Sequence, residues 1–256
     1  MSSVRRIPFH FNAKGHAFSA HFHRPVDVPI SAQAATSLPT VGGHAHARVD
    51  NFEVPRLVRF RSGSAHVSGS WQDDQIVTTG ATAVVEDFNL LDYLTADRIV
   101  ANLTAEYTRH TTNKDAHIIA LGSHFENLRL GGHAVKVILR HDLLLNSRTF
   151  AELRNNLAND AKSGKMTVID NGVVLCSLVD RIETDLTHLP GFEIRGHILR
   201  VPHFGELALA EIFAVPGSIT LTMIRFDLGS PTSGLGTVVE AGTNGQPLPP
   251  MPPTTS

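Results

Sequence analysis

Apolar and polar residues alternate with a period of two along much of the chain. In residues 98–107 one set of alternate positions reads Ile, Ala, Leu, Ala and Tyr, and the other reads Arg, Val, Asn, Thr and Glu. Successive side chains of a strand point to opposite faces, so this pattern predicts an antiparallel strand with one buried face. The same period predicts strands at 17–23, 57–61 and 219–226. A helix over 90–105 also fits the apolar spacing, but the β-branched residues there favour a strand.

Glycine-containing links separate some of these stretches. Gly131-Gly132 lies between two apolar segments, and a two-residue link in which both positions adopt positive φ is typical of a β-hairpin. Asp170-Asn171-Gly172 predicts a second hairpin for the same reason.

A five-residue phrase occurs three times, at 50–54, 86–90 and 126–130. In each copy, two acidic or amide residues precede two large apolar residues that are separated by one residue. This spacing places both apolar side chains on the same face of a strand. The phrase predicts a β scaffold built from related units. It supplies no nucleophile, phosphate-binding loop or metal cage.

One segment departs from the β pattern. Thr149 and Glu152 have the spacing of a helix capping box, and apolar residues continue at helical spacing until Ser163-Gly164. We therefore predict one amphipathic helix over 149–162 that packs against the sheets. The predicted fold class is all-β, an antiparallel β-sandwich or a flattened barrel with this one helix.

The length favours one large β domain over residues 1–242. The alternative is two packed β subdomains that meet near 145–165, because 256 residues suffice for either arrangement. Residues 243–256 are rich in proline, which cannot donate ladder hydrogen bonds, so they predict a disordered or polyproline-II tail.

Composition limits the partners. A net charge of −2 carries no electrostatic signature of nucleic-acid binding. The single cysteine, Cys176, excludes an intrachain disulfide. We find no signal peptide and no apolar run long enough to enter a membrane, and we expect a cytoplasmic protein or one exported by a non-classical route.

Four segments together resemble bacterial surface proteins of the choice-of-anchor type. They are 30–39, 79–91, 94–101, which contains a Thr-Ala-Asp strand, and 122–132, which contains a Gly-Ser segment and a Gly-Gly hairpin. The resemblance implies a repetitive extracellular β scaffold with no catalytic residues to carry over. Those proteins are normally exported and end in a sorting signal, and neither feature is recognisable in this sequence.

Two His-x-His pairs are the strongest chemical signal. His21 and His23, like His44 and His46, place two imidazoles on one face of a strand, as β metal sites commonly do. If the two strands pair, four imidazoles converge on a divalent transition metal. However, His44 and His46 share their face with an arginine and an aspartate, which is typical of a solvated surface, so we expect no bound cofactor.

Other candidate residues are less specific. Trp71 is the only tryptophan, and with Asp73 and Asp74 in the following loop it is a candidate ligand-binding group, since an exposed tryptophan can stack on a sugar. A tryptophan in a core or at its rim is the commoner case. No spacing singles out a catalytic pair among the carboxylates Glu53, Glu86, Asp92, Asp97, Glu126 and Glu211.

Nucleophile elbows, Walker loops, dinucleotide fingerprints and His-Glu-x-x-His helices are all missing from the sequence. We therefore expect a non-enzymatic β-scaffold for surface attachment, ligand binding or self-assembly, with a second copy, a surface or a glycan as its partner. The alternative is an enzyme or a small-molecule-binding barrel with a pocket at one end, either of which could depend on a metal held by histidines.

Overall fold

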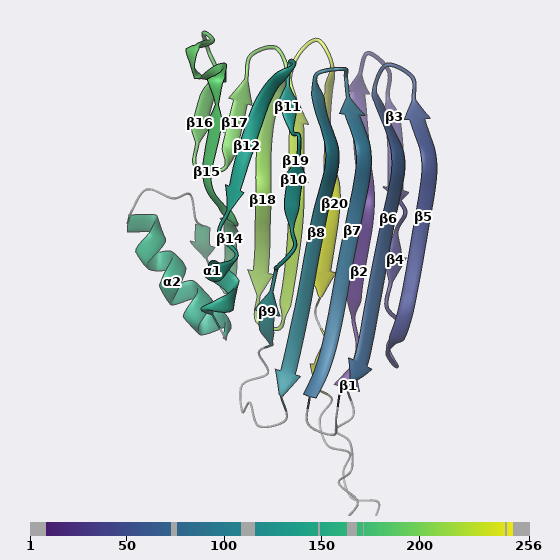
Figure 1. Cartoon of the computed structure of the whole chain (residues 1–256), viewed down its shortest axis with the longest axis vertical. Helices are drawn as coiled ribbons and strands as arrows, with labels where there is room; N and C mark the ends of the chain where they lie inside the picture. Colours follow the sequence, from purple (N-terminus) through teal and green to yellow (C-terminus); the bar gives the residue numbers. More distant parts are fainter. Residues whose placement is uncertain are drawn as a thin grey trace, which may run out of the picture.

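The computed structural model describes residues 9–72, 76–108, 116–147, 149–162, 168–170, 172–243 and 245–247. Two large antiparallel sheets lie face to face, and the helices lie to one side of them (Figure 1). The predicted all-β class is confirmed. The architecture is a sandwich, because the described strands form no closed barrel. No helix among the described residues is long and apolar enough to cross a membrane.

The first sheet has nine strands in the order β15-β12-β11-β8-β7-β6-β5, with β9 and β10 also paired to β8. Their bounds are β5 Gly43–Val54, β6 Val58–Trp71, β7 Ile76–Leu90, β8 Leu94–Thr108, β9 His117–Ile119, β10 His124–Glu126, β11 Arg129–Leu130, β12 His133–Leu139 and β15 Val179–Thr184. Residues 94–108 are therefore a strand, as the β-branched residues predicted.

The second sheet has ten strands along the path β13-β14-β18-β19-β20-β2-β3, with β4 paired to β2 and the β16-β17 hairpin joined to β18. Their bounds are β2 Ala13–Arg24, β3 Val28–Gln33, β4 Thr36–Ser37, β13 Val168–Asp170, β14 Val173–Ser177, β16 Glu193–Arg195, β17 Ile198–Val201, β18 Gly205–Val215, β19 Ser218–Leu228 and β20 Ser233–Thr243.

The ends of the described chain pair with each other. Strand β1, Phe9–His10, pairs with β21, Gln246–Pro247. The predicted tail begins at residue 243, but Thr243 still belongs to β20, and Gln246 lies in a strand that pairs with β1. The rest of the predicted tail, 248–256, lies outside the described residues.

Both predicted hairpins are present. Gly131 and Gly132 link β11 to β12 with φ values of 56° and 84°, which a glycine adopts without a steric penalty. In the second hairpin Asp170 lies opposite Val173. Asn171 itself is outside the described residues.

The predicted helix is also confirmed as α2, Phe150–Lys162. The Thr149 hydroxyl accepts a hydrogen bond from the Glu152 backbone N–H at 3.1 Å, which is the expected N-terminal cap. Leu153 and Leu157 are buried against the body of the protein. A short helix α1, Asp142–Leu145, and a 3-10 turn, Asp185–His188, were not predicted.

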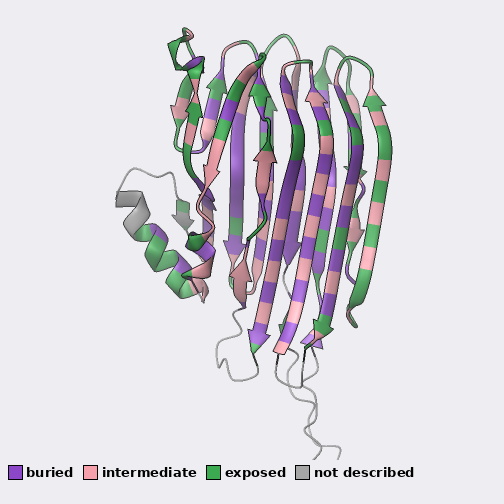
Figure 2. Cartoon of the chain, in the orientation of Figure 1, coloured by how far each residue is buried: buried purple, intermediate pink, exposed green. Residues whose placement is uncertain are grey.

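One continuous hydrophobic core fills the space between the sheets and includes residues from Phe9 to Ala241. The ring centroid of Phe18 on β2 lies 6.3 Å and 5.9 Å from those of Phe60 and Phe88 in the first sheet. It lies 6.2 Å from that of Phe226 in the second sheet, so Phe18 contacts strands of both sheets. Buried residues alternate with less buried ones along the long strands (Figure 2).

The repeated five-residue phrase marks a row of unusual backbone conformations across the first sheet. Its second residue is Asn51, Asp87 or Asn127, and these have φ values of 52°, 52° and 49°. Asn and Asp tolerate this left-handed conformation better than other non-glycine residues. Through the register of β5 to β8 and β10, these residues fall in one row with Arg61 and Asp97.

This row shifts the inside-outside alternation by one residue in each strand. On β7, for example, both Glu86 and Asp87 face outward between the buried Val85 and Phe88. In the second sheet the alternation shifts with two successive buried residues instead of two successive outward-facing ones. These are Val238 and Val239 on β20, and Val239 has a φ of 58°. The apolar side chains of each sheet therefore face the core on both sides of the row.

The backbone at Asn51 provides a test. Asn51 is exposed, so its replacement changes the local backbone energy more than the packing. We expect Asn51→Val to lower the free energy of unfolding by about 1–2 kcal/mol, because a β-branched residue disfavours positive φ. The matched variant Asn51→Gly should change it by less than about 0.5 kcal/mol. Urea denaturation measures both, and equal losses would contradict this account.

Candidate functional site

A hollow lined by both polar and apolar residues lies on the outer face of the second sheet. It has a volume of about 420 Å³ and lies over β3, β2, β20 and β19. Its polar lining residues are Ser19, His21, Arg225, Asp227 and Thr237. Alternation brings Ser19 and His21 there, since Phe18, Ala20 and Phe22 on β2 are buried on the core face and the two residues between them point outward.

Thr237 is the centre of a hydrogen-bonded group in this hollow. Its hydroxyl lies 2.9 Å from the Ser19 hydroxyl and 2.9 Å from Nε2 of His16. Burial lowers the pKa of His16, and the nearby carboxylate of Glu240 opposes this effect only in part. The neutral imidazole is therefore favoured, and the group offers hydroxyls for hydrogen bonding.

Arg225 is held at the hollow by a buried carboxylate. Its Nε and Nη2 donate to Glu211 at 2.6 and 2.9 Å, and Nε2 of His197 donates to the same carboxylate at 3.1 Å. The Glu211 side chain is 8% exposed, whereas that of Arg225 is 49% exposed. Burial raises the pKa of Glu211, but the hydrogen bonds from His197 and Arg225 outweigh it, and the pKa falls from 4.5 to about 2.

Three potential metal ligands meet at one edge of the hollow. His21 and His23 both point outward from β2, and their ring centroids are 4.2 Å apart. The carboxylate of Asp27, in the turn to β3, lies 2.6 Å from Nε2 of His21 and 3.8 Å from Nδ1 of His23. Sequence reasoning found the two histidines but missed Asp27. The signal available was a proline-containing turn that folds Asp27 back beside His23.

The second His-x-His pair lies elsewhere. His44 and His46 are on β5, which pairs with β6 in the first sheet, whereas β2 pairs with β3, β4 and β20 in the second. The strand pairing required for four converging imidazoles is therefore absent from the described sheets. His46 lies opposite His66, and both are exposed.

Trp71 lies at the end of β6 and is partly buried. Its ring makes edge-to-face contacts with Phe9 and Phe11, at centroid distances of 6.2 and 6.5 Å. This is the geometry of an aromatic anchor at the rim of the core. Asp73 and Asp74 lie outside the described residues.

The glutamates of the repeated segments, Glu86 and Glu126, contact polar side chains on the outer face of the first sheet. Glu86 accepts a hydrogen bond from the Ser62 hydroxyl at 2.7 Å and lies 3.2 Å from Arg61. Glu126 lies 2.9 Å from Nε2 of His124. Each glutamate therefore has a structural partner next to the row of positive-φ residues.

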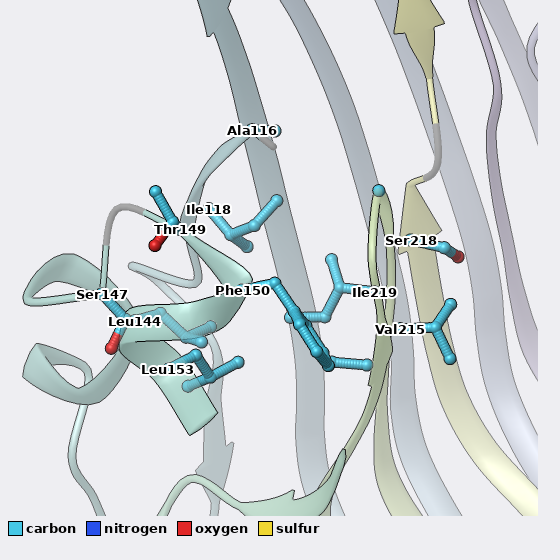
Figure 3. Close-up of a pocket in the computed structure, with 12 residues that line it drawn as sticks. Ala116, Ile118, Leu144, Ser147, Thr149, Phe150, Leu153, Val215, Ser218 and Ile219 are labelled. Atoms are coloured by element: carbon cyan, nitrogen blue, oxygen red, sulfur yellow. The ribbon is translucent and has the colours of Figure 1, made fainter. Parts of the chain in front are cut away.

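A second hollow lies at the helical side of the sandwich (Figure 3). Phe150 and Leu153 of α2 face Ile219 of β19 across it, and its other lining residues are apolar or small. Its volume of about 40 Å³ is far below the roughly 300–1,000 Å³ of typical ligand pockets. Its lining contains no carboxylate and no histidine.

The comparisons with known proteins give one result. The family described as Domain of unknown function (DUF8256) matches residues 9–168 and 158–215. No curated protein and no solved structure matches the chain. The resemblance to choice-of-anchor proteins stays a prediction.

The Glu211 cluster predicts a pH-dependent stability. Because the pKa of Glu211 is lower in the folded protein than in the unfolded chain, its stabilisation is complete above pH 4.5 and is lost as the pH falls towards 2. We expect Glu211→Gln to lower the free energy of unfolding by about 2–3 kcal/mol at neutral pH and to flatten its dependence on pH in that window.

Denaturant titrations across this pH range provide the measurement. Glu206→Gln is the matched control, because Glu206 lies on the same strand and makes an exposed ion pair with Arg200 at 2.8 Å. It should change the free energy of unfolding by less than about 1 kcal/mol. Similar effects from both substitutions would show that the Glu211 cluster has no special role.

Proposed function

The chain belongs to the DUF8256 family, and we propose that it acts as a non-enzymatic β-scaffold that assembles with further copies of itself through the free edge of β5. The observation that supports this proposal is the length of that edge. Strand β5 has 12 residues and pairs on one side only, with β6, among the described strands. Figure 1 shows it at the outer limit of the first sheet.

The other sheet edges are shorter or better protected. Strands β3 and β15 have 6 residues each, and β13 has 3. Pro29 lacks a backbone N–H and so removes one hydrogen-bond donor from β3. The short strand β15 carries the charged residues Asp180, Arg181 and Glu183. Short strands, prolines and charges are the usual means by which proteins prevent edge pairing. Between Gly43 and Asp50, β5 has no proline, and its two charged side chains there, Arg48 and Asp50, pair with each other.

The inward side of β5 supplies apolar surface for an interface. Ala45 and Val49 pack against the core, Ala47 lies on the same face by alternation, and all three remain partly exposed. A second copy paired along this edge would bury these side chains and would also satisfy the free backbone donors and acceptors.

Antiparallel pairing about Ala47 fits the side chains of this segment. In that register Ala47 faces Ala47 of the second copy, Ala45 faces Val49, and His44 faces Asp50. The small residues then line the inner seam, and the imidazole of His44 lies beside a carboxylate on the outer face. Cross-strand pairs of this kind each contribute roughly 0.2–1 kcal/mol.

The test is the mass of the protein in solution over a wide concentration range, measured by sedimentation velocity and light scattering. We expect a reversible dimer of the wild-type chain. Ala47→Lys should weaken the dimer by about tenfold or more, which is about 1.4 kcal/mol, because it places two ammonium groups opposite each other. A wild-type protein that remains monomeric near its solubility limit would refute the proposal.

Two comparisons make the experiment specific to β5. Ala134→Lys on β12 is the matched control, because Ala134 is exposed on a strand that pairs on both sides, and it should leave the dimer unchanged. An equimolar mixture of Ala47→Lys and Ala47→Glu should recover association, since the register about Ala47 brings the opposite charges together. If Ala47→Lys dimerises like the wild type, the dimer uses another surface.

A further inference from the structure

We propose that His21, His23 and Asp27 form a binding site for one divalent transition-metal ion of the zinc class. Two imidazole nitrogens and one carboxylate oxygen lie within 4.8 Å of one another in this group. Imidazole and carboxylate are common ligands for this class of ion, and a set of two histidines and one carboxylate recurs in protein metal sites.

The spacing suits coordination after small side-chain rotations. In a tetrahedral zinc site with bonds of about 2.0–2.1 Å, neighbouring ligand atoms lie about 3.4 Å apart. The Asp27 oxygen is 2.6 Å from the His21 nitrogen and 3.8 Å from the His23 nitrogen, so the two distances bracket this value. The side chains of His21, His23 and Asp27 are 43%, 47% and 72% exposed, which leaves them room to rotate.

The backbone fixes the three residues relative to one another. Phe22, between the histidines, is fully buried and lies opposite Val28 on β3. This pair anchors the end of the β2-β3 hairpin, holds both imidazoles on the outer face and brings Asp27 beside them. Ligands presented by a fixed backbone lose less conformational entropy when the ion binds.

The site has an open side next to the hollow on the outer face of the second sheet, because His21 also lines that hollow. Three protein ligands leave at least one coordination position of a tetrahedral ion for water or for another ligand. Such a position is typical of metal ions that take up an exchangeable ligand. Asp227 and Arg225 lie in the same hollow and give it both signs of charge.

Zinc binding to tag-free protein tests the proposal. Isothermal titration with zinc chloride should give one ion per chain, and titration with cobalt(II) should produce the visible absorption bands of a site with nitrogen and oxygen ligands. We expect His23→Ala and Asp27→Asn each to weaken zinc binding by about tenfold or more, since loss of even an outer-shell partner costs roughly 10–100-fold.

His46→Ala is the matched control, because it removes one imidazole from the other His-x-His pair and should leave zinc affinity unchanged. Circular dichroism of every variant checks that the fold is retained. Ala47→Lys should bind zinc like the wild type, so this result is separate from the dimer of β5. The proposal is wrong if the wild type binds no zinc, if Asp27→Asn and His23→Ala bind it as tightly as the wild type, or if His46→Ala weakens it equally.

Discussion

Every long strand must turn its apolar side chains towards the one space between the two sheets, and the rest of the structure depends on this constraint. A strand that shifted its alternation alone would expose its apolar residues beyond the shift. The first sheet therefore shifts all its long strands in one row, which includes Asn51 and Asp87, and the second sheet shifts in a row that includes Val239. Phe18 contacts Phe88 and Phe226 between the two sheets and so joins these adjustments within one core.

The same constraint decides which side chains are available for binding. Once the inner faces are committed to the core, function is left to the outer faces and to the free edges of the sheets. On the second sheet, Ser19, His21 and Thr237 gather on the outer face beside Arg225. On the first sheet the outer face carries charged pairs, and the 12-residue edge of β5 remains unpaired on one side among the described strands.

The two polar clusters of the second sheet have different physical roles. Glu211 is almost fully buried, and its hydrogen bonds lower its pKa to about 2, so it fixes Arg225 and stabilises the fold. The side chains of His21, His23 and Asp27 are much more exposed and are held by the hairpin rather than by burial, which is why we propose them as ligands for an ion. This difference in burial is what separates a structural cluster from a candidate binding site.

The sequence alone determined the local features: the strands, the Gly131-Gly132 hairpin, the capped helix α2 and the recurrence that marks the positive-φ row. These depend on alternation, turn chemistry and capping, all of which act between residues close in the chain. Only the tertiary structure decided that β2 pairs with β20, that His44 lies on a different sheet from His21, and that Asp27 lies beside the two histidines of β2. Many strand pairings satisfy the same alternation, and the choice among them is made by packing between residues far apart in sequence.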